Sequence, residues 1–381
     1  MIDICRKEYC TGCGLCVSQC PKQCISLQVD AKFGHLYPHI EQTTCIDCGL
    51  CQKKCPANHA VDGIKPKVAY AAWSKDEEDY RSSTSGGAAS VLSHYIISKG
   101  GVVYGCAMLP DIDVRHIRID RLEDIPKLKG SKYVQSSITE IISQLKSDVK
   151  NGKDTLFIGT PCQVAALRSI YKDQPENLYL VDLICHGVPS LSILKKHIKK
   201  VADYPHYDNI IFRESSYIVV VVVDGQVVYK CPFNRPRYKD WYINTFFDGY
   251  TYRDSCYHCH YACPERISDI TVGDFWGLGK KKSAKEIPPH PNGCSVMMPI
   301  TEKGQVLIDS IREKMNVYER DVEEAVAGNS QLRTPCSLTL RRKFFRVIFP
   351  YIGRSAYWLA VLDKYIKYQM LRGKNSIINK R

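Results

Sequence analysis

The stretch CTGCGLCVSQCP at residues 10–21 recurs as CIDCGLCQKKCP at residues 45–56, and this duplication decides the fold of the N-terminal part of the chain. Both copies have the spacing C-x2-C-x2-C-x3-C-P. Three cysteines of each copy share a tight loop, whereas the fourth leaves that loop on a short helix that the following proline ends. Cysteines in so regular a pattern indicate ligands of an inorganic cofactor.

The spacing is typical of proteins that hold two [4Fe-4S] clusters, in which the fourth cysteine of each copy binds the cluster of the other copy. Gly12, Gly14 and Gly49 keep side chains away from the inorganic core. A zinc site or a disulfide framework is the alternative, but zinc takes four ligands and not two sets of three with a crossing fourth. The expected ligands are Cys10, Cys13, Cys16 and Cys55 for one cluster, and Cys45, Cys48, Cys51 and Cys20 for the second.

The composition is that of a globular chain: 381 residues, 44% of them hydrophobic and 24% charged, a length that allows about two or three domains. The first ten residues lack the apolar core of a signal peptide, and no apolar run is long enough for a membrane helix. Nineteen cysteines without such a signal indicate metal sites in a reducing compartment and not disulfides. We therefore expect a cytoplasmic protein.

Most of the formal charge of +13 lies at the C-terminus, where residues 341–381 contain eleven Lys or Arg against a single acid, Asp363. No base-reading module precedes this tail, so nucleic acid is not an expected partner. A solvated tail, an acidic partner or an anionic membrane surface fits better, and the last would place the protein at the inner face of the membrane. The apolar and basic segment Phe344–Ile352 suits either a bilayer surface or ordinary helix packing.

After residue 67 the pattern changes to strands followed by helices, which is typical of an α/β fold. Expected strands are 68–73, 102–109, 117–120, 155–159, one that starts at 178, several within 208–231, 269–276 and 294–301; expected helices are 88–99, about 138–150, 163–171, 190–202 and one from about 302. The fold class is an α+β ferredoxin-like module followed by an α/β domain with a mixed sheet. The expected domains are 1–64, 67–310, and a helical, basic extension over 311–381.

A third metal site is expected within the α/β domain. Cys162 and Cys185 both follow buried strands, and the carboxyl ends of parallel strands are where ligands gather in such sheets. The pair Cys256-x2-Cys259 offers two more thiols, so we expect these four cysteines to hold a third [4Fe-4S] cluster, with Cys263 as the alternative ligand. A zinc knuckle or free thiols are the other interpretation. Cys5, Cys24, Cys106, Cys231, Cys294 and Cys336 are expected to be packing residues.

The loop Thr84-Ser-Gly-Gly87 precedes the expected helix 88–99 and makes Ser85 the expected N-cap. Free backbone amides at a helix start attract anions, so this loop is a candidate phosphate site, with a plain cap as the alternative.

The order of these motifs resembles the coenzyme F420 hydrogenase/dehydrogenase beta-subunit family, which is itself similar to plant hydroxymethyl-chlorophyll reductase. The resemblance covers roughly residues 1–310. It rests on the cysteine-rich run, Thr84-Ser-Gly-Gly-Ala, Lys129-Gly-Ser-Lys-Tyr-Val, Gly159-Thr-Pro-Cys-Gln, Cys185-His-Gly-Val-Pro, Cys256-x2-Cys259 and Asp269-Ile-Thr-Val-Gly-Asp-Phe-Trp-Gly277. Neither Cys263 nor the basic tail matches the family pattern.

The resemblance implies an FAD-binding, iron–sulfur oxidoreductase that exchanges electrons between a two-electron partner, such as a deazaflavin or another small-molecule redox substrate, and one-electron carriers such as a ferredoxin. It implies that the flavin borders Thr84, Ser85, Gly86, Gly87, Lys129, Ser131, Lys132 and Tyr133. Lys129 and Lys132 are candidates for binding its phosphates or its reduced form, with surface charges as the alternative. Two other roles stay open: a relay subunit without turnover of its own, linked to surface-polysaccharide biosynthesis, and a docking protein with structural clusters.

Overall fold

The computed structural model of the chain describes residues 3–171, 173–214, 216–232 and 240–362. Of the basic C-terminal segment 341–381, residues 363–381 lie outside these ranges. Within them, no helix is long and apolar enough to cross a membrane.

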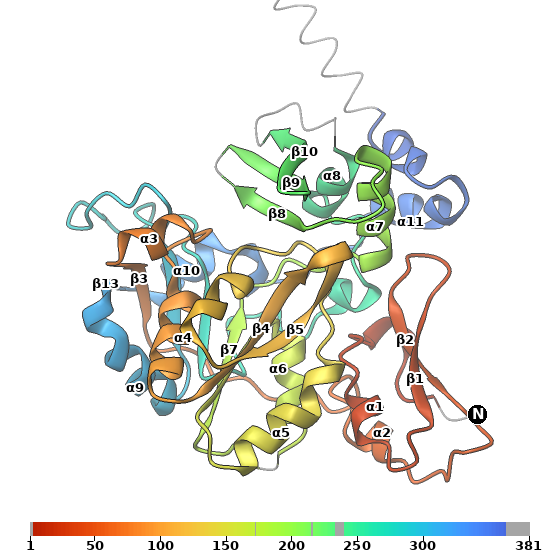
Figure 1. The fold of residues 1–381 in the computed structure, drawn as a ribbon, viewed down its shortest axis with the longest axis horizontal. Coiled ribbons are helices and arrows are strands. Elements are labelled where there is room, and N and C mark those ends of the chain that lie inside the picture. The colour runs from red at the N-terminus through yellow and green to blue at the C-terminus, as the bar shows by residue number, and fades with distance from the viewer. Residues whose placement is uncertain (1–2, 172, 215, 233–239, 363–381) are drawn as a thin grey trace, which may run out of the picture.

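The N-terminal module has the ferredoxin-like arrangement predicted from its cysteines. Strands β1 (Ile25–Val29) and β2 (Leu36–Ile40) pair antiparallel, with Ile25 opposite Ile40. Helices α1 (Leu15–Gln19) and α2 (Leu50–Lys53) follow the two cysteine loops and pack against each other. Cys20 therefore leaves its own loop on α1, and Cys55 comes directly after the turn that ends α2. Figure 1 shows this module as a separate unit beside the rest of the chain.

The centre of the molecule is a mixed sheet of eight strands in the order β13-β3-β12-β11-β7-β6-β4-β5. The neighbours β4, β6, β7 and β11 run parallel, and the remaining pairs are antiparallel. The predicted mixed-sheet α/β fold is thus confirmed. The strands are β3 (Ala69–Ser74), β4 (Val102–Leu109), β5 (Asp113–Ile119), β6 (Thr155–Gly159), β7 (Leu178–Leu183), β11 (Ile270–Asp274), β12 (Ser295–Pro299) and β13 (Met315–Arg320).

Helices cover both faces of this sheet because successive residues of each buried strand point to opposite sides. Leu156 of β6 faces a core with Leu92 and Leu307, whereas its neighbour Phe157 faces a core with Leu145. The helices of the first core are α4 (Ala88–Ser98) and α9 (Glu302–Ile311), and those of the second are α5 (Ile142–Lys150) and α6 (Pro161–Arg168). Two shorter helices are α3 (Glu77–Arg81) and α10 (Val322–Gly328).

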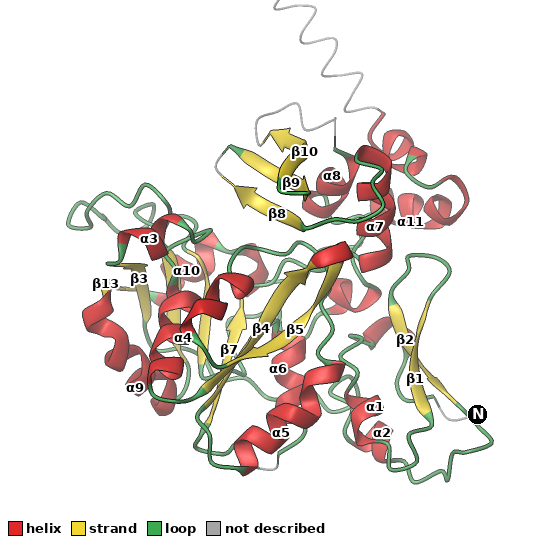
Figure 2. Cartoon of the chain, in the orientation of Figure 1, coloured by secondary structure: helices red, strands yellow, loops and turns green. Residues whose placement is uncertain are grey.

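A second, three-stranded sheet lies apart from the large one and carries its own helices (Figure 2). The expected hairpin at Asp224-Gly225 is present, since both residues have positive φ and Val223 pairs with Gln226. The strands are β8 (Asn209–Glu214), β9 (Tyr217–Val223) and β10 (Gln226–Pro232), and the helices are α7 (Leu191–Val201), α8 (Trp241–Phe247) and α11 (Leu340–Ile352). They share one core with Phe33 of the N-terminal module.

Three sequence expectations were wrong in detail. The N-cap of α4 is Gly87, whose φ of 80° suits glycine, and not Ser85. Helix α6 covers Pro161–Arg168 instead of 163–171, because Thr160 and Gln163 form a capping box at its start. Strand β13 pairs with β3, so the large sheet continues past the expected boundary at residue 310.

His116 on β5 is a buried titratable group with a clear consequence for stability. Its ring stacks on Phe157 with 5.1 Å between centroids, and its Nε2 lies 3.0 Å from the carbonyl oxygen of Ile158. Burial lowers the pKa of His116 to about 4, whereas an exposed histidine has a pKa near 6.5. Between about pH 6.5 and pH 4, this histidine is therefore protonated in the unfolded chain but neutral in the folded chain.

We predict that this group makes the folded state about 2 kcal/mol less stable at pH 5 than at pH 7. His116→Gln keeps a side-chain donor but cannot titrate, so its free energy of unfolding should fall less over the same interval. Urea unfolding under anaerobic conditions at the two pH values measures the difference. Equal pH dependence in the two proteins would show that His116 is not the group responsible.

Candidate functional site

The first predicted set of cysteines surrounds a hollow in the N-terminal module. Cys10, Cys13, Cys16 and Cys55 line a space of about 360 Å³ between the first loop and the end of α2. Cys5, which the sequence assigned to packing, also lines it. A hydrogen bond with Cys5 is the main cause that lowers the pKa of Cys10 to about 6 and that of Cys55 to about 7. Thiolates are the form that binds metals, so these two side chains are prepared for ligation.

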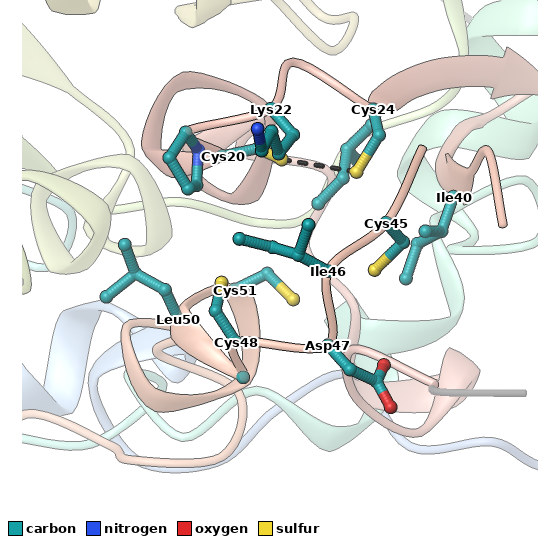
Figure 3. Close-up of a pocket in the computed structure, with 13 residues that line it drawn as sticks. Cys20, Lys22, Cys24, Ile40, Cys45, Ile46, Asp47, Cys48, Leu50 and Cys51 are labelled. Carbon is teal, nitrogen blue, oxygen red and sulfur yellow. Dashed lines mark hydrogen bonds between the residues drawn. The ribbon is translucent and has the colours of Figure 1, made fainter. Parts of the chain in front are cut away.

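The second set lines a similar hollow of about 390 Å³ near the surface. Figure 3 shows Cys45, Cys48 and Cys51 grouped near Ile46, with Cys20 and Cys24 opposite. The Sγ atoms of Cys20 and Cys24 lie 3.3 Å apart, and Cys48 is exposed to solvent. Over the described ranges no three His, Cys, Asp or Glu side chains converge as they would on a single metal ion.

The structure brings the four cysteines predicted for a third site together. Cys162 follows β6 and Cys185 follows β7, and these strands are parallel neighbours. Cys256 and Cys259 come from a short 3₁₀ helix, Asp254–His258, and the residue after it. Burial raises the pKa of all four thiols, that of Cys185 to about 12 and that of Cys259 to about 11.

Mutual proximity adds to this effect. After burial, the largest effect on the pKa of Cys185 and of Cys259 is the negative charge of the nearby Cys162, which raises both values. For Cys256 it is the charge of Cys185. Cys263 does not join the group, because its thiol donates to the carbonyl oxygens of His260 and Glu265 at 3.4 and 3.3 Å. Four thiols in mutual proximity are a donor set for a metal cofactor, and metal binding would release the protons that burial holds on them.

Arg253 connects the N-terminal module to this third set, and sequence reasoning missed it. Its side chain is 1% exposed. Nε donates to the Cys10 carbonyl oxygen at 2.6 Å, and Nη2 donates to the Leu36 carbonyl oxygen at 2.8 Å and lies 3.5 Å from Cys10 Sγ. A Cβ at Gly12 would approach Nη1 to 2.7 Å, so a glycine at this position gives the guanidinium room. Arg253 also lies three residues before Cys256, and therefore borders both cysteine sets.

The first and third sets also meet through apolar packing. Cys13, Cys162 and Cys259 all pack against one buried core that includes Tyr261. Burial and then the charges of Cys162, Cys259 and Cys13 raise the pKa of the Tyr261 hydroxyl. The Cys10 loop is thus next to the third set.

The two segments predicted to border a flavin lie side by side. Ser131 Oγ is 3.4 Å from Thr84 Oγ1, and Ser85 Oγ is 3.5 Å from Ser295 Oγ at the start of β12. No side chain caps α4, whose N-cap is Gly87 and whose preceding residue is Gly86. The cap residue therefore offers no side-chain acceptor to the first backbone amides of this helix.

The predicted lysines are bound by the protein's own groups. Lys129 Nζ lies 2.6 Å from Asp79 Oδ1 and donates to Ser82 Oγ at 2.7 Å. Lys132 Nζ donates to the carbonyl oxygens of Leu128 and Lys129, and burial lowers the pKa of Lys132. Their interpretation as ordinary surface charges does not hold, because both side chains are ordered by these contacts. Asp79 Oδ2 is buried and accepts no hydrogen bond from the described residues.

Tyr133 and its surroundings complete this region. The ring of Tyr133 stacks on Phe246 with 4.5 Å between centroids. Arg213, which has a φ of 58°, donates to Asp274 Oδ2 at 2.7 Å. Burial raises the pKa of Tyr133, and the nearby charge of Arg213 opposes this effect. Asp274 lies inside a quoted motif, but nothing in the sequence pointed to Arg213.

Comparisons with known proteins agree with these features. Residues 152–325 match the family model for the C terminus of the coenzyme F420 hydrogenase/dehydrogenase beta subunit, and residues 9–59 match a 4Fe-4S dicluster domain. Both matches lie on one chain, in the order in which the sequence motifs occur. The resemblance predicted from the motifs is therefore confirmed.

Among solved structures, a chain of the xenon-derivatised F420-reducing [NiFe] hydrogenase complex from Methanosarcina barkeri is similar to this chain. The identity is 19% and the TM-score 0.45, over 77% of this chain and 91% of that chain. No curated protein matches the chain.

We predict that Arg253→Lys makes the reduction potential of one N-terminal cluster more negative. Lysine keeps the charge but loses the N–H···S contact with Cys10, and such hydrogen bonds stabilise the reduced cluster. A carbonyl left without a donor should also cost about 1–3 kcal/mol of stability. A redox titration followed by electron paramagnetic resonance measures the potential.

Arg320→Lys is the matched control. Arg320, the last residue of β13, is also buried but pairs with Glu324 and Glu286, at 2.7 and 3.0 Å. This variant should lose stability with both potentials unchanged. Equal potentials in the two variants would mean that Arg253 does not tune the cluster.

Proposed function

We propose that the chain is an FAD-dependent iron–sulfur oxidoreductase that exchanges electrons between a small two-electron substrate and a one-electron protein carrier. The observation that carries this proposal is the proximity of Cys256 and Cys259 to Cys162 and Cys185, which follow the neighbouring strands β6 and β7, beside the Cys13 loop. A third cluster held there would stand next to the first cluster of the N-terminal module. Cysteine sets in contact are what electron transfer through several clusters requires.

The order of the three sets gives the proposed path a direction in space. Cys162 and Cys259 share a packed core with Cys13, so the third set borders the first. In the Cys45 set, Cys48 is exposed to solvent, and its neighbour Ile46 is a large apolar side chain that is also exposed. We infer that the one-electron carrier, a ferredoxin or a similar protein, docks at this outer set.

The flavin is proposed to lie against the Thr84–Gly87 loop and the Lys129–Tyr133 segment, which adjoin each other. FAD accepts or donates two electrons together and exchanges them one at a time, which is the conversion that this path needs. The amides at the start of α4 would hold its phosphates, with Ser85 and Thr84 hydroxyls nearby. Lys129 offsets the charge of Asp79, which would otherwise repel an anion at this loop.

A relay role without turnover of its own is the second candidate, because the outer cysteine set is open to a protein partner. The two roles differ in the response of the flavin. A flavin reduced by dithionite but by no small-molecule donor would favour the relay role.

We predict that the protein purified without air contains about twelve irons per chain and that Cys162→Ala with Cys185→Ala reduces this to about eight. The two N-terminal clusters should keep their spectra. Cys263→Ser is the control, since the Cys263 thiol bonds to backbone carbonyls, and it should keep about twelve irons. Eight irons in the wild-type protein would contradict the third cluster and leave the first two intact.

We predict about one FAD per chain, released by acid and measured by chromatography. Thr84→Val with Ser131→Ala removes the two hydroxyls that lie 3.4 Å apart where the two segments meet, and should lower the flavin content several-fold at unchanged iron content. Ser98→Ala, at the other end of α4, removes a hydroxyl bonded only to the Tyr95 carbonyl among the described contacts and should change neither. Clusters without any flavin in the wild-type protein would overturn the flavoprotein proposal.

A further inference from the structure

Helix α11 presents an apolar stripe to solvent. Leu340, Phe344, Val347 and Tyr351 follow one another at intervals of four, three and four residues, which places them on one side of the helix. They are 84%, 49%, 67% and 86% exposed. Exposed apolar side chains are normal singly, but a contiguous row of four marks an interaction surface.

The opposite side of α11 already has its partners. Phe345 is buried against Tyr250 at 4.9 Å between ring centroids, and Phe349 stacks on Phe33 at 5.1 Å. Arg342 and Arg346 hold this side through the carbonyl oxygens of Asp248 and Tyr252, both at 2.8 Å. The helix thus has two apolar sides, and only the inner one is explained by the fold of the chain.

The following helical residues, 355–362, continue this arrangement. Their buried side chains join the same core as α11, and Tyr357 is one of them. The side chains of Trp358, Leu359 and Leu362 are 38%, 52% and 50% exposed. The outer surface of the C-terminal helices is therefore apolar beyond α11 itself.

The charges around the stripe have one sign. Between Ala325 and Leu362 the sequence has no Asp or Glu and six Arg or Lys, of which Arg333, Lys343 and Arg354 are exposed. The tail that follows, residues 363–381, adds six basic residues and one acid. Apolar side chains surrounded by cations are the combination that binds the interface of an anionic bilayer, where burial of apolar area and attraction to lipid headgroups add.

We propose that the outer stripe of α11 docks this protein on an anionic lipid surface. The surface is distinct from the exposed outer cysteine set, and the proposal does not depend on the nature of the redox reaction. Docking would leave the protein peripheral, since no described helix spans a membrane. It would also hold the core shared by α11 and the N-terminal module close to the bilayer.

The test is sedimentation of the anaerobically purified, iron-loaded protein with vesicles of phosphatidylcholine alone or mixed with phosphatidylglycerol. We expect binding to the mixed vesicles, little binding to the neutral ones, and weaker binding as salt rises. Phe344→Glu with Val347→Glu should lower the partition coefficient at least about tenfold, because it removes two apolar side chains from the interface and adds like charge to that of the lipid. Iron content and circular dichroism verify that the variant folds.

Val306→Glu is the matched control, because Val306 on α9 is 61% exposed and lies on a helix without this charge pattern. It should bind as the wild type does, and a chain that ends at Leu362 should bind more weakly but remain sensitive to the stripe variant. No binding to anionic vesicles, or equal binding by the stripe variant, would overturn the proposal. A wild-type dimer that the stripe variant converts to a monomer, measured by light scattering, would overturn it in favour of a contact between two copies.

Discussion

A buried guanidinium, that of Arg253, is the contact on which the arrangement of the two parts of the molecule depends. Burying a cation costs several kcal/mol unless charges or hydrogen bonds compensate it. Among the described residues no carboxylate forms an ion pair with Arg253; its acceptors are backbone carbonyls of the N-terminal module, Cys10 Sγ and Gln135. A cluster bound to Cys10 would carry the missing negative charge. Binding of the cluster would then stabilise the docked position of the module, because the charge of the cluster compensates the buried Arg253.

Further contacts fix the module against rotation. Ser190, the N-cap of α7, donates to the Phe33 carbonyl oxygen at 2.5 Å, and His35 Nδ1 lies 3.1 Å from Gln135 Oε1. After the module, Ile64 exchanges two backbone hydrogen bonds with Arg266, at 2.8 and 2.9 Å. These contacts lie at separate places on the module. The distance between the cysteine sets is therefore set by rigid packing and not by a linker.

Sequence patterns predicted the features that depend on residues close together in the chain. They did not predict those that depend on contacts between distant segments. The cysteine loops, the α4 and α7 helices and the hairpin at Asp224-Gly225 each depend on neighbours a few residues apart, which a pattern reveals. Arg253 and Arg213 acquire their roles only from segments far away in the chain, and an isolated arginine carries no signal. Cys5 and Cys24 fell outside the repeated spacing, although the fold brings them back to it. Strand β13 was missed because its alternation is weak and its partner, β3, is distant.

The position of β3 has a consequence for how the protein is made. This strand is the first of the large sheet to leave the ribosome, yet both of its neighbours, β12 and β13, are near the other end of the domain. At 5–20 residues per second, synthesis from Ser74 to Arg320 takes roughly 10–50 s. Until β12 has been made, this strand, which is buried along its whole length in the folded protein, has no hydrogen-bonding partner, and this exposes the nascent chain to aggregation. The cysteine loops that precede it are complete by then, so iron can be delivered to the module before the sheet closes.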